Sequence, residues 1–181
     1  MDIELLWSKP LPIKMDTPEG EEGKHGIFAF VYDKKEIIYI GKALESMNLY
    51  QESKNRYGPL GRAFEKLGLL DRNASNDEKE IIERDYCEKY VAELAGYNYS
   101  DEDKFKLKNA EKLLVFVKQP IGNVHYKKRY SGVIPIRVTN KGPITGELLS
   151  DYYEILEYHI ACALLPEIQA GPPSDSTKSM R

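Results

Sequence analysis

The run His125-Tyr126-Lys127-Lys128-Arg129-Tyr130 combines basic and aromatic residues. Basic side chains bind the phosphate backbone of nucleic acids, and aromatic rings stack on exposed bases. We therefore name His125, Lys127, Lys128 and Arg129 as candidate substrate-binding residues. A solvated turn of ordinary charged residues is the alternative, and the run alone does not decide between the two.

Two other blocks combine glycine with charged or polar residues, and the first of them also contains a tyrosine. The first contains Gly26-Ile27-Phe28 and, further on, Tyr39-Ile40-Gly41-Lys42. The second contains Glu111 and then Gln119-Pro120-Ile121-Gly122-Asn123, and Arg62 lies between the blocks. Taken alone, Tyr39 is interpreted as a strand tyrosine with a buried ring. Glu111 is interpreted as a surface glutamate on a helix, and Lys42 and Arg62 are interpreted as solvated charged residues. Only the joint order of these residues points to a shared site.

Together the two blocks resemble the paired signature of the GIY-YIG nuclease superfamily. In that family a helix carries a metal-binding glutamate, and a Pro-x-x-Asn closes the motif downstream, as in the interval from Glu111 to Asn123. The family places its catalytic arginine where a helix begins, which is the position of Arg62 here. The resemblance covers the chain from about Gly26 to Asn123.

The resemblance implies a role for each matching residue. Glu111 would bind one divalent cation, Mg²⁺ or Mn²⁺, and Arg62 would contact the scissile phosphate. Tyr39 would orient the attacking water or accept its proton, with Lys42 as the neighbouring cation and Asn123 orienting the assembly through hydrogen bonds. One glutamate is sufficient because Mg²⁺ keeps most of its waters and takes substrate phosphates as further ligands. Phosphodiester hydrolysis also needs fixed positive charge where negative charge develops.

The sequence departs from the family pattern at Phe28, where relatives have the first signature tyrosine. In relatives that hydroxyl helps to activate the attacking water. Either another group, such as His25 or Tyr50, supplies this function, or the protein is a slow or inactive member. The departure therefore puts catalysis, more than fold, in question.

A second departure is the loop between Ala43 and Arg62, which is longer than in compact members of the family. The extra length makes Arg56 a rival for the catalytic arginine. We prefer Arg62, because it follows Gly58-Pro59 at a predicted helix start. Long loops of this kind are loosely similar to the restriction enzymes of the superfamily.

The composition predicts one soluble globular domain. The chain has 181 residues, of which 41% are hydrophobic and 30% charged, and a formal net charge of -3. This negative charge argues against a protein that coats DNA through its overall charge. It is compatible with a nuclease, because a metal-binding site needs acidic residues nearby. We expect no membrane contact and a cytoplasmic location, because no apolar run could span a bilayer and the N-terminus carries acids. Cys87 and Cys162 lie among apolar neighbours and are expected to be reduced structural thiols.

Local patterns predict the elements that carry the first block. Residues 26–32 and 37–40 are rich in β-branched and aromatic side chains and share a short polar connector, which predicts a β-hairpin. Residues 60–70 have helical apolar spacing. In the ambiguous segment 78–94, two-residue alternation favours a third strand in the second half.

Downstream, Ser100 precedes three acids, which predicts a helix start, and Pro120 predicts its end. Residues 133–139 are predicted to be a strand. Residues 145–165 are predicted to be a second long helix with an apolar stripe that includes His159 as a structural histidine.

We therefore expect an α/β (α+β) fold with a small, mostly antiparallel central sheet flanked by helices. Residues 1–24 would form an N-terminal extension with at most one strand. The GIY-YIG-like domain would span residues 25–170, including a C-terminal strand and helix, and residues 171–181 would be a disordered tail.

The resemblance implies a metal-dependent endonuclease that hydrolyses DNA, with RNA left open as a substrate. The alternative is a catalytically weak or inactive nucleic-acid-binding module of the same fold, which Phe28 favours. No separate DNA-recognition domain is evident, so specificity must come from loops, from a homodimer or from a partner.

Overall fold

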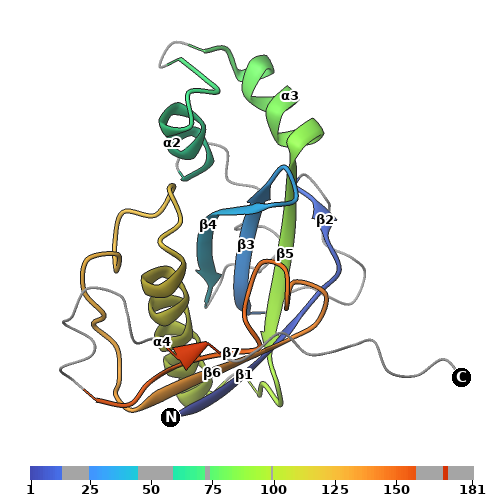
Figure 1. Ribbon diagram of the computed structural model, residues 1–181. Coiled ribbons are helices and arrows are strands. Elements are labelled where there is room, and N and C mark those ends of the chain that lie inside the picture. The colour runs from blue at the N-terminus through green and yellow to red at the C-terminus, as the bar shows by residue number, and fades with distance from the viewer. Residues whose placement is uncertain (14–24, 45–58, 72–73, 99, 158–168, 171–181) are drawn as a thin grey trace, which may run out of the picture.

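The computed structural model describes residues 1–13, 25–44, 59–71, 74–98, 100–157 and 169–170 (Figure 1). Their strands are β1 (Asp2–Trp7), β2 (Leu11–Pro12), β3 (Gly26–Tyr32), β4 (Glu36–Ala43), β5 (Cys87–Leu94), β6 (Ile136–Lys141), β7 (Tyr152–Ile155) and β8 (Gln169–Ala170). Their helices are α2 (Pro59–Lys66), α3 (Asn76–Tyr86) and α4 (Asp101–Lys118). The expected α+β class is confirmed.

One strongly curled sheet contains all of these strands. Seven follow in the order β4-β3-β5-β1-β6-β7-β8, and β2 pairs with β5 beside this path. Neighbours are antiparallel except β1 and β6, which are parallel. The sheet is therefore mixed and mostly antiparallel, with β4 at one edge of the path.

The β3–β4 hairpin and the third strand, β5, are confirmed. Ser75 caps α3 with a full capping box, and the helix continues to Tyr86 before Cys87 begins β5. The helix start at Ser100 is also confirmed, since its side chain accepts a hydrogen bond from the Asp103 amide. These boundaries follow from local capping chemistry.

Helices on both faces of the β3–β4 hairpin explain why β3 is almost wholly buried. Ile27, Ala29 and Val31 belong to a core cluster that includes buried residues of α4. Phe28 and Phe30 belong to a second cluster with buried residues of α2. Successive strand side chains point to opposite faces, so the hairpin separates two cores.

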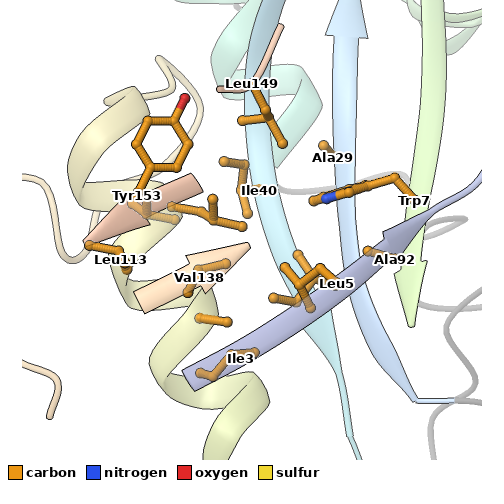
Figure 2. Close-up of a cluster of buried hydrophobic side chains, with 14 of the residues drawn as sticks. Ile3, Leu5, Trp7, Ala29, Ile40, Ala92, Leu113, Val138, Leu149 and Tyr153 are labelled. Atoms are coloured by element: carbon orange, nitrogen blue, oxygen red, sulfur yellow. The ribbon is translucent and has the colours of Figure 1, made fainter. Parts of the chain in front are cut away.

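The N-terminal segment is not an extension outside the sheet, and it contains two strands rather than at most one. β1 lies between β5 and β6 in the strand order. Ile3, Leu5 and Trp7 alternate with more exposed residues and are buried, and Figure 2 shows them in one cluster with side chains from other strands. Two-residue alternation is the pattern of a strand with one face in the core.

The predicted helix at residues 145–165 is wrong over its described part. Residues 145–150 form turns, β7 follows, and residues 158–165 lie outside the described chain. Tyr153 and Ile155 are buried and pair with Val138 and Ile136 of β6. Gly146 has a φ of 85°, a left-handed conformation that breaks a helix. Over its described residues up to 157, the predicted strand-helix extension is therefore a pair of strands, β6 and β7, and β6 begins at Ile136 rather than at residue 133.

Several sequence-based predictions fall outside the described residues, namely Tyr50, Arg56, His159, Cys162 and the tail at residues 171–181. Cys87 is a buried free thiol, and burial raises its pKa to about 12. None of the described helices combines the length and apolarity that crossing a membrane requires.

Candidate active site at the β4 edge

Glu111 and Lys42 meet across 69 residues of sequence. Lys42, on β4, donates a hydrogen bond from Nζ to Oε2 of Glu111, on α4. The Glu111 side chain is 9% exposed and the Lys42 side chain 26%, so this ion pair is mostly removed from water. A partly buried pair of this kind fixes the direction of the carboxylate.

Tyr39 and Lys42 lie on opposite faces of β4. Lys42 pairs with Ile27, whose side chain faces α4, whereas Tyr39 pairs with Phe30, whose side chain faces α2. Cross-strand partners share a face of the sheet. Lys42 therefore contacts Glu111 on one face of β4, whereas Tyr39 packs among aromatic rings on the other face.

Phe28, Tyr39 and Gly41 pack tightly on the α2 face. Phe28 is 3% exposed, and its ring centroid lies 5.9 Å from that of Tyr39. A Cβ atom on Gly41 would lie 2.6 Å from Cζ of Phe28 and 2.8 Å from Cε1 of Tyr39. Glycine is required here because the two rings occupy the space of a side chain. Cζ of Phe28, the atom that bears the hydroxyl in a tyrosine, therefore lies directly over Gly41.

Asn123 completes the hydrogen bonding of β4. Its Oδ1 accepts from the Ile40 amide at 2.9 Å, and its Nδ2 donates to the Ile40 carbonyl at 2.7 Å. The Gly122 amide donates to the Ile38 carbonyl at 2.8 Å. The segment after α4 thus occupies the free edge of β4 beside Tyr39 and Gly41.

Burial raises the pKa of Glu111 above its ordinary value of 4.5. Lys42 acts in the opposite direction through its charge and hydrogen bond, and Lys112 and His125 add smaller opposing effects. Desolvation therefore outweighs the positive charge around this carboxyl group. A bound divalent cation would offset the same desolvation.

The raised pKa predicts how Glu111 changes stability with pH. The Glu111 carboxyl group binds a proton more tightly in the folded protein than in the unfolded chain. Protonated Glu111 therefore stabilises the fold below pH 4.5, and this stabilisation is lost as pH rises through the pKa of the folded state. Relative to Glu111→Gln, the free energy of unfolding of the wild type should fall with rising pH across this window. Urea unfolding of both proteins between about pH 4 and pH 8 tests this. A difference that does not change with pH would contradict it.

Arg62 and the basic run stand at the surface. Arg62 is exposed on α2 and lines an open hollow with Glu65, Lys66, Leu70 and Asp71. His125, Lys128 and Arg129 are exposed, whereas Lys127 is half-buried. Exposure leaves these side chains accessible to a ligand.

His25, one candidate to replace the missing hydroxyl, is buried and pairs through Nδ1 with the Tyr97 hydroxyl at 2.6 Å. It precedes Ile27 by two residues, which places it at the end of β3 on the α4 side. Its burial and its partner are those of a structural histidine.

The donor set at Glu111 fits a cation that needs one protein carboxylate. Among the described residues there is no group of three or more His, Cys, Asp or Glu side chains arranged to hold a metal. Mg²⁺ accepts such a site, because water and substrate phosphates complete its shell. In this structure the Lys42 ammonium lies beside Oε2 of Glu111.

Sequence reasoning missed two lysines near this site. Lys112 contributes to the positive surroundings of Glu111, and its Nζ lies 5.7 Å from the centroid of the Tyr126 ring. Lys66 donates to the Ile121 carbonyl at 2.9 Å. Their sequence positions were a usable signal, since Lys112 is next to Glu111 and Lys66 is one helical turn after Arg62.

Comparison with known proteins gives no relatives: no family model, no curated protein and no solved structure matches the chain. Any functional assignment must therefore be argued from the order of the motif residues and from the contacts described above.

Proposed function

We propose that this protein is a metal-dependent endonuclease of the GIY-YIG type that hydrolyses DNA phosphodiester bonds. The observation that carries the proposal is the pairing of Glu111 with Lys42, which joins the two sequence blocks in space. The Asn123 hydrogen bonds to Ile40 join the same blocks a second time. Residues that matched the signature only by chance would not be expected to contact each other in the folded protein.

In the proposed reaction Glu111 holds one Mg²⁺ or Mn²⁺ ion, which when bound would lower the pKa of a coordinated water and polarise the phosphate. Lys42 orients the Glu111 carboxylate through the ion pair. Arg62 is exposed and presents a planar fork that matches phosphate oxygens. Glu111 and Tyr39 face opposite sides of β4, and Gly122 and Asn123 cover the edge of this strand beside Tyr39, so the proposed reaction does not require one phosphate to contact both residues.

One observation favours the alternative, a binding module that has lost catalysis. Phenylalanine has no hydroxyl that could act on the attacking water, and the Phe28 ring is buried among aromatic and aliphatic side chains. The exposed Lys128 and Arg129 would still serve a binding role without chemistry. Restoring the hydroxyl therefore distinguishes the two functions.

Phe28→Tyr is expected to raise the rate of metal-dependent nicking of supercoiled plasmid by about tenfold or more, since positioned acid–base groups contribute at least that much. Phe30→Tyr is the matched control, because Phe30 is equally buried in the same aromatic cluster. Each new buried hydroxyl costs about 1–3 kcal/mol if unpaired, so both variants should be similarly destabilised. Only Phe28→Tyr should gain activity.

The outcomes separate the hypotheses. Nicking by the wild type that a chelator stops supports the nuclease. Nicking by Phe28→Tyr alone supports a silenced binding module. DNA binding without nicking in all variants also supports the binding module, whereas neither binding nor nicking would contradict the resemblance itself.

A further inference from the structure

Lys66 and Lys127, from distant parts of the chain, approach the same short loop. Lys66 Nζ donates to the carbonyl of Ile121 at 2.9 Å, and Lys127 Nζ donates to the carbonyl of Pro120 at 2.9 Å. Lys66 is the last residue of α2, and Lys127 belongs to the basic run. Both ammonium groups bind the same short loop, and the charge of Lys66 acts on the pKa of Lys127, so the two groups lie near each other.

Among the described residues, no carboxylate forms an ion pair with Lys66 or Lys127. Burial lowers the pKa of Lys127, and the charge of Lys66 lowers it further. Glu65 and Asp71 line the hollow beside Lys66, but within the described chain neither forms an ion pair with Lys66 or Lys127. An ammonium has three N–H donors, so each lysine keeps donors for an anion after its bond to the loop.

The pair is structurally continuous with the candidate active site. The loop that the two lysines hold continues into Gly122 and Asn123, which bind β4. Arg62 lies one helical turn before Lys66, and both line the same hollow. Arg62, Lys66 and Lys127 therefore form a row of cations that begins at the residue proposed to contact the scissile phosphate.

We propose that Lys66 and Lys127 together bind a backbone phosphate of the DNA strand, adjacent to the phosphate that is cleaved. This inference rests on the proposed function and extends it by assigning the course of the strand across α2 and the loop after α4. Lysine ammonium groups act as point charges on phosphate and carry no sequence information. The pair therefore contributes affinity and register, and leaves base selection to other parts of the protein.

The test is the affinity of the full chain for a fluorescent DNA oligonucleotide, measured by anisotropy at several salt concentrations in the presence of a chelator. Lys66→Ala/Lys127→Ala should weaken binding about tenfold, equally for unrelated sequences, and lower the slope of log affinity against log salt by about one unit. Lys9→Ala/Lys108→Ala removes the same charge from two exposed lysines outside the row and should change neither quantity. Lys66→Gln/Lys127→Gln keeps N–H donors for the loop carbonyls but removes both charges, and it should weaken binding as much as the alanine pair, which a purely structural role in the loop would not predict.

Affinity and salt slope equal to those of the wild type in the alanine pair would overturn the phosphate site, as would an equal loss in the charge-matched control. Plasmid nicking, measured separately, keeps this result distinct from the proposed function. Nicking by the wild type with unchanged binding in the alanine pair refutes the lysine pair alone. Loss of binding in that pair without any nicking supports the phosphate site and refutes the nuclease.

Discussion

Glu111→Gln is expected to reduce metal-dependent plasmid nicking by about 10²- to 10³-fold, the loss that corresponds to several kcal/mol of metal-assisted stabilisation. Glutamine keeps the volume and one oxygen of the side chain but removes the charge that attracts a divalent cation. The same change removes the ion pair with Lys42, which is mostly shielded from water. The nicking rate should be measured at saturating DNA over a range of Mg²⁺ and Mn²⁺ concentrations. Weaker metal binding raises the metal concentration that is needed for half-maximal nicking.

Glu102→Gln is the matched control on the same helix. Glu102 is exposed in the first turn of α4 and pairs with Lys106 at the surface. Exposed pairs of this kind contribute little to stability, so this variant should nick and unfold like the wild type. Wild-type nicking by Glu111→Gln at all metal concentrations would exclude Glu111 as the metal ligand.

Asn123→Ala is expected to lower the free energy of unfolding by about 2–4 kcal/mol. The change leaves the amide and the carbonyl of Ile40 without their side-chain partners, and each buried unpaired group costs about 1–3 kcal/mol. For a chain of this length the unfolding temperature should fall by about 5–15 °C. Asn76→Ala, which removes an exposed asparagine at the start of α3, is the control and should change the temperature little.

The same variant tests whether Asn123 positions the site. Nicking should be compared well below the unfolding temperature of both proteins, so that the fraction unfolded does not affect the rate. We expect a lower maximal rate with little change in DNA affinity, because Asn123 is buried and hydrogen-bonds to the strand that carries Tyr39 and Lys42. Normal stability and normal rate together would show that the Ile40 hydrogen bonds are dispensable.

Local sequence patterns determined the elements that carry the candidate site. The β3–β4 hairpin follows from β-branched and aromatic residues around a polar turn, and α4 follows from the Ser100 cap, three acids and the stop at Pro120. Such signals are local, since capping, turn formation and side-chain periodicity depend on residues only a few positions apart. Glu111, Lys42 and Asn123 stand out as candidate site residues only through the resemblance to the GIY-YIG signature and not through these local patterns.

Pairing partners decided the remaining strands. The alternation of Ile3, Leu5 and Trp7 becomes a central strand because β5 and β6 lie on either side of it. The apolar residues of the segment from 145 to 157 fit a helix stripe as well as a strand, and β6 selects the strand by pairing with Tyr153 and Ile155. Short apolar segments are ambiguous in this way because their backbone hydrogen bonds depend on a distant partner.

Tertiary structure alone decided which charged groups meet. Sequence order suggested Lys42 as the cation beside Tyr39, but the alternation of β4 turns these two side chains to opposite faces and brings Lys42 to Glu111. The approach of Lys66 to Lys127 likewise depends on how α2 and the loop after α4 pack against β4. A motif specifies which side chains are present and which element carries each. The distances between them, and therefore the charge that each one meets, arise only when elements far apart in the chain pack together.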